Sequence, residues 1–134
     1  MPNAFITMVV LCREVRQNSE GFLDLVGVVP DSIVLIDDAP GELHLQAVVR
    51  VFAEAAGEYP FRAGFQSPHG GVAGSLIQWG MRFDQPETSR EVVVDVEFQP
   101  EADGLYWFVV SVGPGTATKV PLEVRWAPNS CPAK

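Results

Sequence analysis

Asp103-Gly104-Leu105-Tyr106-Trp107-Phe108-Val109-Val110-Ser111-Val112 is the segment most typical of a β-strand. A turn dipeptide is followed by residues that are mostly β-branched or aromatic, the side chains most enriched in strands. Tyr106 and Phe108 share one parity, whereas Trp107 and Val109 share the other, so both faces of the segment are apolar. Two apolar faces are typical of a strand inside a sheet that is covered on both sides. The stretch therefore predicts a central strand of a β-sandwich.

The same period-two alternation recurs along the rest of the chain, interrupted by Gly, Pro, Asn and Asp at turn positions. The expected strands are 4–15, 22–29, 33–36, 42–53, 61–66, 75–83, 90–98, 105–112 and 116–126. No segment has a convincing helical period. The sequence predicts an all-β fold, an antiparallel two-sheet β-sandwich of immunoglobulin-like type. A jelly roll or closed barrel is the alternative.

Length and composition limit the number of domains and the classes of partner that the chain can have. A chain of 134 residues with 47% hydrophobic and 19% charged residues suits one globular domain. We expect residues 1–127 to form that single β-sandwich domain and residues 128–134, which hold two prolines, to form a flexible C-terminal tail. The net charge of −8 disfavours nucleic acid and anionic membrane surfaces, both of which need basic patches, but it leaves open a basic partner.

The N-terminal apolar run and the cysteines bear on location. No run reaches the roughly 18–20 residues of a membrane span. Residues 4–12 lack a preceding Lys or Arg and lack small residues before Cys12, so they are expected to be a strand rather than a signal peptide. We predict that Cys12 is a buried thiol. A bridge to Cys131, in the Pro-flanked tail, is less expected because a cytoplasmic setting disfavours disulfides.

Tyr106 is a candidate structural residue. A Tyr near the start of a late strand forms the tyrosine corner of many immunoglobulin-like sandwiches, where its hydroxyl binds a backbone group of the preceding loop. The position of Tyr106 just after Asp103-Gly104 predicts this role, which concerns stability rather than function.

Trp107 and Val109 are the candidate partner-binding residues. They face away from Tyr106, so something must cover them: the tail or a loop, which is slightly favoured, a protein partner, or a second copy of the chain. The two apolar faces of strand 4–15 favour a homodimer. Trp79 and Trp126 share parity with apolar neighbours and are expected in the core.

No metal or cofactor is expected. Four acidic loop residues could hold Ca²⁺ with their carboxylates, but their spacing matches no known calcium loop. They are Asp31, Asp37, Asp38 and Glu42.

Nor does the sequence predict an enzyme. His44 and His69 have no partner at metal-ligand spacing. Ser67 and Ser75 lack the context of a nucleophile elbow.

Two stretches carry a resemblance. One is Leu11-Cys12-Arg13-Glu14-Val15 with the following Gly21-to-Val29 segment, and the other is Asp103 to Val110 with the closing Val120-Pro121-Leu122-Glu123-Val124. Together they resemble a family of short uncharacterised bacterial proteins with a single immunoglobulin-like β-sandwich domain. The resemblance covers about a third of the chain and implies a bacterial, cytoplasmic origin. It transfers no functional residue, because no activity is assigned to that family.

The leading hypothesis is therefore a non-enzymatic interaction domain that self-associates or docks to a protein partner. The alternative is a module that binds a small molecule or a carbohydrate by stacking it on aromatic side chains. Trp107, Tyr59 and Phe61 are the candidates for such a platform.

Overall fold

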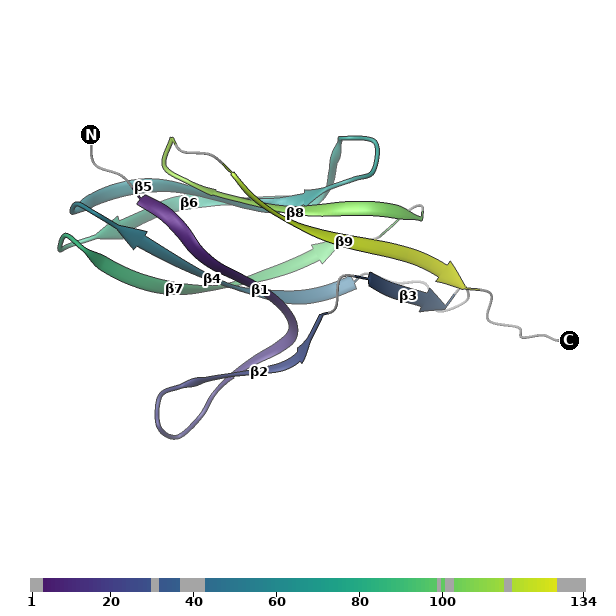
Figure 1. Ribbon diagram of the computed structural model, residues 1–134, viewed down its shortest axis with the longest axis horizontal. Helices are drawn as coiled ribbons and strands as arrows, with labels where there is room; N and C mark the ends of the chain where they lie inside the picture. Colours follow the sequence, from purple (N-terminus) through teal and green to yellow (C-terminus); the bar gives the residue numbers. More distant parts are fainter. Residues whose placement is uncertain are drawn as a thin grey trace, which may run out of the picture.

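The computed structural model describes residues 4–29, 32–36, 43–98, 100, 103–114 and 117–127. All nine expected strands are present (Figure 1). Their bounds are β1 Ala4–Gln17, β2 Leu23–Val28, β3 Ser32–Ile36, β4 Leu43–Ala53, β5 Gly57–Gln66, β6 Val72–Phe83, β7 Thr88–Phe98, β8 Gly104–Val112 and β9 Thr118–Ala127. Within these ranges no helix is long and apolar enough to span a bilayer.

The strands form two sheets, in the orders β2-β1-β4-β7 and β3-β9-β8-β5-β6. Figure 1 shows them as two layers that are not closed into a barrel. The predicted β-sandwich is confirmed, and the closed barrel is excluded. One pair departs from the antiparallel pattern of both sheets: β3 runs parallel to β9, with Ser32 opposite Glu123. The chain crosses from the first sheet to the second before β3, and local alternation carries no information about that change of direction.

The core confirms the central position predicted for the opening stretch. β8 lies between β9 and β5. Tyr106, Phe108, Val110 and Val112 all point into the core, each 2% exposed or less. The Phe108 ring packs on the ring of Phe65 with centroids 5.2 Å apart. Burial of several aromatic and branched side chains from both sheets is the main source of stability in a sandwich.

Gly104 explains how β8 begins. Its φ of +146° lies where L side chains are rarely found. A Cβ at this position would stand 2.7 Å from Cγ of Pro68, in the β5–β6 loop. Glycine is thus required both by the backbone conformation and by the close approach of the loop.

The β1–β2 hairpin leaves the sandwich. The first part of β1 pairs with β4 as far as Cys12 opposite Gln46, and its second part pairs with β2 (Cys12 to Gln17). Figure 1 shows the end of β1 curling out of the layer so that the hairpin projects from the body. Gly27 in β2 has a φ of +67°, and a Cβ there would stand 3.1 Å from the side chain of Arg13, while the register from Cys12–Val28 to Glu14–Val26 stays unshifted.

The side chain of Gln46 holds the point where β1 departs. Its Oε1 accepts a hydrogen bond from the Val15 N–H (2.6 Å), and its Nε2 donates to Oδ1 of Asp95 on β7 (2.7 Å). Because β4 no longer pairs with β1 beyond Cys12, this amide replaces the missing backbone partner. Gln46 therefore links β7, β4 and the base of the hairpin.

Candidate binding surface

Alternate residues of β8 face away from the core, as the sequence predicts. Leu105 is 41% exposed on this outer face of the five-stranded sheet, and Trp107 and Val109 are half-buried. Val72 and Leu76 on the β6 side are more exposed, at 65% and 50%. We call these five residues the outer patch. Among the described residues no further sheet covers it.

Strand register makes the outer patch continuous across the sheet. One row runs from Val72 through Gln66 on β5 to Trp107. In the next row Val109 lies opposite Gly64 on β5. Gly64 has no side chain to fill the space, and a hollow of about 360 Å³ lies over it, lined also by Leu76. The patch therefore has a concave centre between apolar walls.

Two cationic side chains line the same hollow. Arg62 extends from β5 and Lys119 from β9, where Lys119 lies opposite Val109. Neither is in an ion pair among the described parts of the chain. The chain has a net charge of −8, but two cations without ion-pair partners make the surface of this hollow locally positive. It attracts carboxylates and repels cations.

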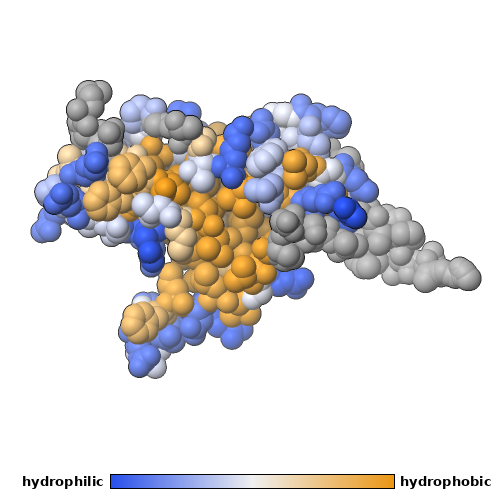
Figure 2. All heavy atoms as spheres, in the orientation of Figure 1, coloured by the Kyte–Doolittle hydropathy of each residue, from blue (hydrophilic) through white to orange (hydrophobic). Residues whose placement is uncertain are grey.

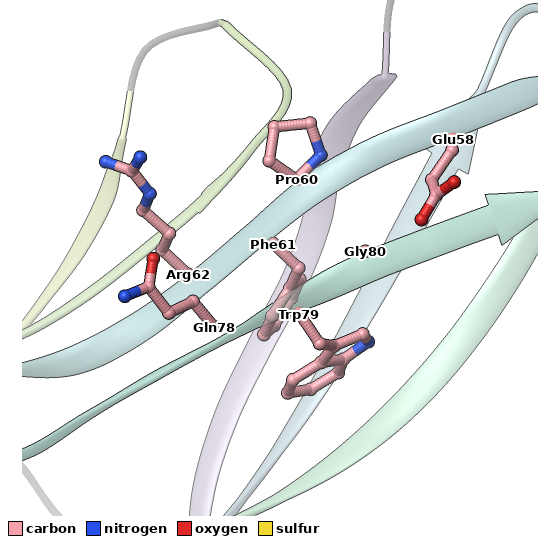
Figure 3. A pocket seen from close by; sticks show the side chains of 7 residues that line it. All are labelled: Glu58, Pro60, Phe61, Arg62, Gln78, Trp79 and Gly80. Carbon is pink, nitrogen blue, oxygen red and sulfur yellow. The ribbon is translucent and has the colours of Figure 1, made fainter.

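A second hollow of about 550 Å³ lies further along β5 and β6 (Figure 3). Arg62 and Gln78 lie side by side at one end, and Glu58 lies close to Gly80 at the other. The Trp79 ring packs against Phe61 with centroids 4.5 Å apart.

The prediction that Trp79 belongs to the core is wrong in part. Its parity is correct, since it shares a face with the buried Met81 and Phe83, but 37% of it is exposed. β6 is the edge strand of its sheet. A large ring at an edge is reached by solvent from the side, which alternation alone does not reveal. The side chain of Trp126 lies outside the described ones.

The expected aromatic platform is also corrected. Tyr59 and Phe61 are 5% and 0% exposed, because β5 begins at Gly57 and places them on a core strand rather than in a loop. The Tyr59 hydroxyl donates a hydrogen bond to the carbonyl oxygen of Ala55 (2.7 Å). Of the three aromatic residues expected to bind a ligand, only Trp107 faces outward.

Tyr106 lies near the start of β8 and is buried, as a tyrosine corner requires. The hydrogen bond that defines the corner remains a prediction. The structural role of Tyr59, whose hydroxyl does bind a turn carbonyl, was not predicted. The turn at 54–56, a few residues before Tyr59, is the sequence feature that could have indicated this role.

The residues considered for chemistry are separated in space or fall outside the described part. Nδ1 of His44 is 3.3 Å from Oε2 of Glu97, and both side chains are exposed. In the β5–β6 loop it is the backbone N–H of His69, not its imidazole, that donates to Oγ of Ser67 (3.3 Å). The four acidic loop residues and the Ser75 side chain are not described. Among the described residues no three His, Cys, Asp or Glu side chains converge on a metal position.

Cys12 is a free, fully buried thiol, as predicted. Its Sγ donates to the carbonyl oxygen of Gln46 at 3.5 Å. Burial raises the pKa of the thiol, and the hydrogen bond from the backbone of Glu14 opposes this rise in part. Such a thiol is a packing residue rather than a nucleophile. Cys131 lies outside the described residues.

No family model and no curated protein matches the chain. Solved structures with a similar arrangement include β-glucosidase from Listeria innocua in complexes with glucose, isofagomine and gluconolactone. The identity is 10% in each case, and the TM-scores are 0.48, 0.48 and 0.47. The alignments cover 93% of this chain but only 16% of the β-glucosidase chains.

Proposed function

We propose that this protein is a non-enzymatic interaction domain that docks a protein partner on the outer patch. The observation that carries the proposal is the outer patch itself, in which the half-buried Trp107 and Val109 of a central strand lie near the exposed Val72 and Leu76. A contiguous apolar surface that includes an aromatic residue and is bordered by polar groups is typical of protein interfaces.

The hollow over Gly64 indicates what kind of segment would dock. Its walls suit one apolar side chain, and Arg62 and Lys119 suit carboxylates on either side of it. The net charge of the chain is negative and would repel an acidic segment from the rest of its surface. The two cations therefore also favour docking at this hollow over docking elsewhere. The partner we propose presents an apolar residue between acidic ones.

The proposal includes the setting that the sequence suggests. The buried Tyr106 at the start of β8 supports an immunoglobulin-like sandwich. The bacterial, cytoplasmic origin is part of the proposal and rests on the resemblance of the two sequence stretches alone. Of the three aromatic residues first considered for the carbohydrate alternative, only Trp107 is left, since Tyr59 and Phe61 are buried, although Trp79 is 37% exposed beside the second hollow.

Site-specific photo-crosslinking tests the proposal. Benzoylphenylalanine replaces Leu76 in the cells that make the protein, and replaces Val93 in a control. Val93 is also exposed (41%), but it lies on β7 in the other sheet. We expect a discrete adduct with another protein from position 76 only, which Lys119→Glu reduces.

Equal adducts from both positions, or none from position 76, would overturn the proposal. Loss of the adduct on addition of soluble oligosaccharides would favour the carbohydrate alternative. Mass spectrometry of the crosslinked peptide identifies the docked segment, and a segment without acidic residues would contradict the role of Arg62 and Lys119.

A further inference from the structure

The outer edge of β2 is a free sheet edge. β2 ends the four-stranded sheet, and no other described strand pairs with it. The hairpin turn contains a hydrogen bond from the Asn18 N–H to the Phe22 carbonyl oxygen (2.9 Å). In an antiparallel ladder, hydrogen-bonded residue pairs alternate with pairs that are not hydrogen-bonded. After Asn18 and Phe22, the next hydrogen-bonded pairs are therefore Arg16 with Asp24 and Glu14 with Val26. The peptide groups of Leu23 and Leu25 therefore point away from β1, toward the open edge.

This edge lacks the features that normally protect one. β7, at the other side of the sheet, carries Arg90, Glu91, Asp95 and Glu97, whereas β2 carries a single charge, Asp24. Val28 is 58% exposed and Phe22, at the hairpin tip, 68%. Figure 2 shows hydrophobic side chains continuing from the body of the sandwich onto the hairpin. An unprotected apolar edge is a template for another strand.

The hairpin also has little to support it. A two-stranded ribbon is marginally stable in water unless further strands or other packing cover it (Figure 1). A strand added at β2 would supply both the missing backbone bonds and cover for the exposed valines.

We propose that the added strand is β2 of a second copy, so that two four-stranded sheets join into one continuous sheet. Charge favours this occupant. The whole chain has a net charge of −8 and two copies repel each other over most of their surface. The segment 12–29 holds two arginines and three carboxylates, a net charge of only −1, and Arg16 is paired with Glu14. The hairpin is the place where copies approach with little repulsion.

The sequence of β2 selects one register. A two-fold pairing centred on Asp24 would set two Asp24 carboxylates directly opposite each other, which destabilises a sheet. A pairing centred on Leu25 places Leu25 opposite its copy, so that the edge-pointing N–H and C=O of Leu25 bond those of the second copy. Asp24 then lies beside Val26 of the second copy. We infer the register centred on Leu25.

Sedimentation velocity over a concentration series tests the proposal on the full chain. Wild type forms a dimer, and Val26→Glu, which sets a carboxylate opposite Asp24 of the second copy, weakens it by at least about tenfold. The matched control is Val93→Glu on the charged edge of the same sheet, since Val26 and Val93 are 38% and 41% exposed. The control leaves the dimer unchanged.

Hydrogen exchange followed by NMR supplies a second readout that needs no variant. The amide of Leu25 becomes protected as the concentration rises, whereas the amides of Asp24 and Val26, already bonded to β1, change little. A monomer at every concentration, or a dimer in which Leu25 stays unprotected, overturns the proposal. A dimer lost on Leu76→Lys but not on Val26→Glu would also overturn it, and would assign self-association to the outer patch instead.

Discussion

The Tyr59 hydroxyl closes the turn between β4 and β5 by its bond to the Ala55 carbonyl oxygen. Removing it in Tyr59→Phe leaves that carbonyl without its partner while the ring stays packed on Phe83. We expect the free energy of unfolding to fall by about 1 kcal/mol, measured by urea denaturation. Tyr106→Phe, made in parallel, tests the predicted corner: an unchanged stability there would show that the Tyr106 hydroxyl binds no loop group.

The buried thiol of Cys12 predicts how the free energy of unfolding changes with pH. Because burial raises its pKa in the folded protein, the unfolded chain loses the thiol proton at a lower pH than the folded one does. Its contribution to stability is constant below the ordinary thiol pKa and decreases as pH rises from there toward the raised value. Cys12→Ser titrated over the same range reports the difference. An identical alkaline decline in both proteins would contradict this prediction.

Accessibility gives an independent check on the same residue. A fully buried thiol reacts with iodoacetamide only when the surrounding strands open, so its alkylation should follow global or local unfolding. Peptide mapping separates Cys12 from Cys131. Rapid modification of Cys12 in the native protein would contradict the buried position.

At the scale of elements, Gln46 holds the hairpin to the sandwich. Gln46→Leu leaves the Val15 N–H without an acceptor and releases Asp95 on β7. We expect the amides of β2 to exchange faster by roughly tenfold or more, since a half-buried orphaned donor costs about 1–3 kcal/mol. Gln78→Leu, on the exposed edge strand β6, is the control. Equal exchange in both variants would show that the hairpin is held by other contacts.

Much of the fold follows from local pattern. Alternation located all nine strands, placed Tyr106 inside and Trp107 outside on β8, and identified β8 as central. Alternation could not predict the direction of β3, because its parallel pairing with β9 depends on where the chain crosses between the sheets.

The candidate surface could be predicted only in part. Trp107 and Val109 were identified from parity, but the hollow depends on Gly64 coming opposite Val109, a long-range register. Trp79 was misjudged because exposure at an edge strand depends on how far the other sheet extends. Tyr59 was misjudged because β5 begins earlier than the turn residues indicate.

At the scale of the whole molecule, the two proposed surfaces belong to different sheets. The β2 edge continues the four-stranded sheet sideways, whereas the outer patch lies on the far side of the five-stranded sheet. Pairing through β2 therefore leaves both outer patches open. A dimer would present two docking sites, and a partner with two matching segments would gain avidity without any new contact.

The parallel pair of β3 and β9 has a consequence for how the chain is made. Ser32 lies opposite Glu123, about ninety residues later, so this pairing closes nearly the longest loop the domain contains. On the ribosome β3 emerges early and must wait for β9, the last of the nine described strands to be synthesised. Contacts of such long range form slowly, and the sandwich can close this edge only after synthesis of β9 is complete.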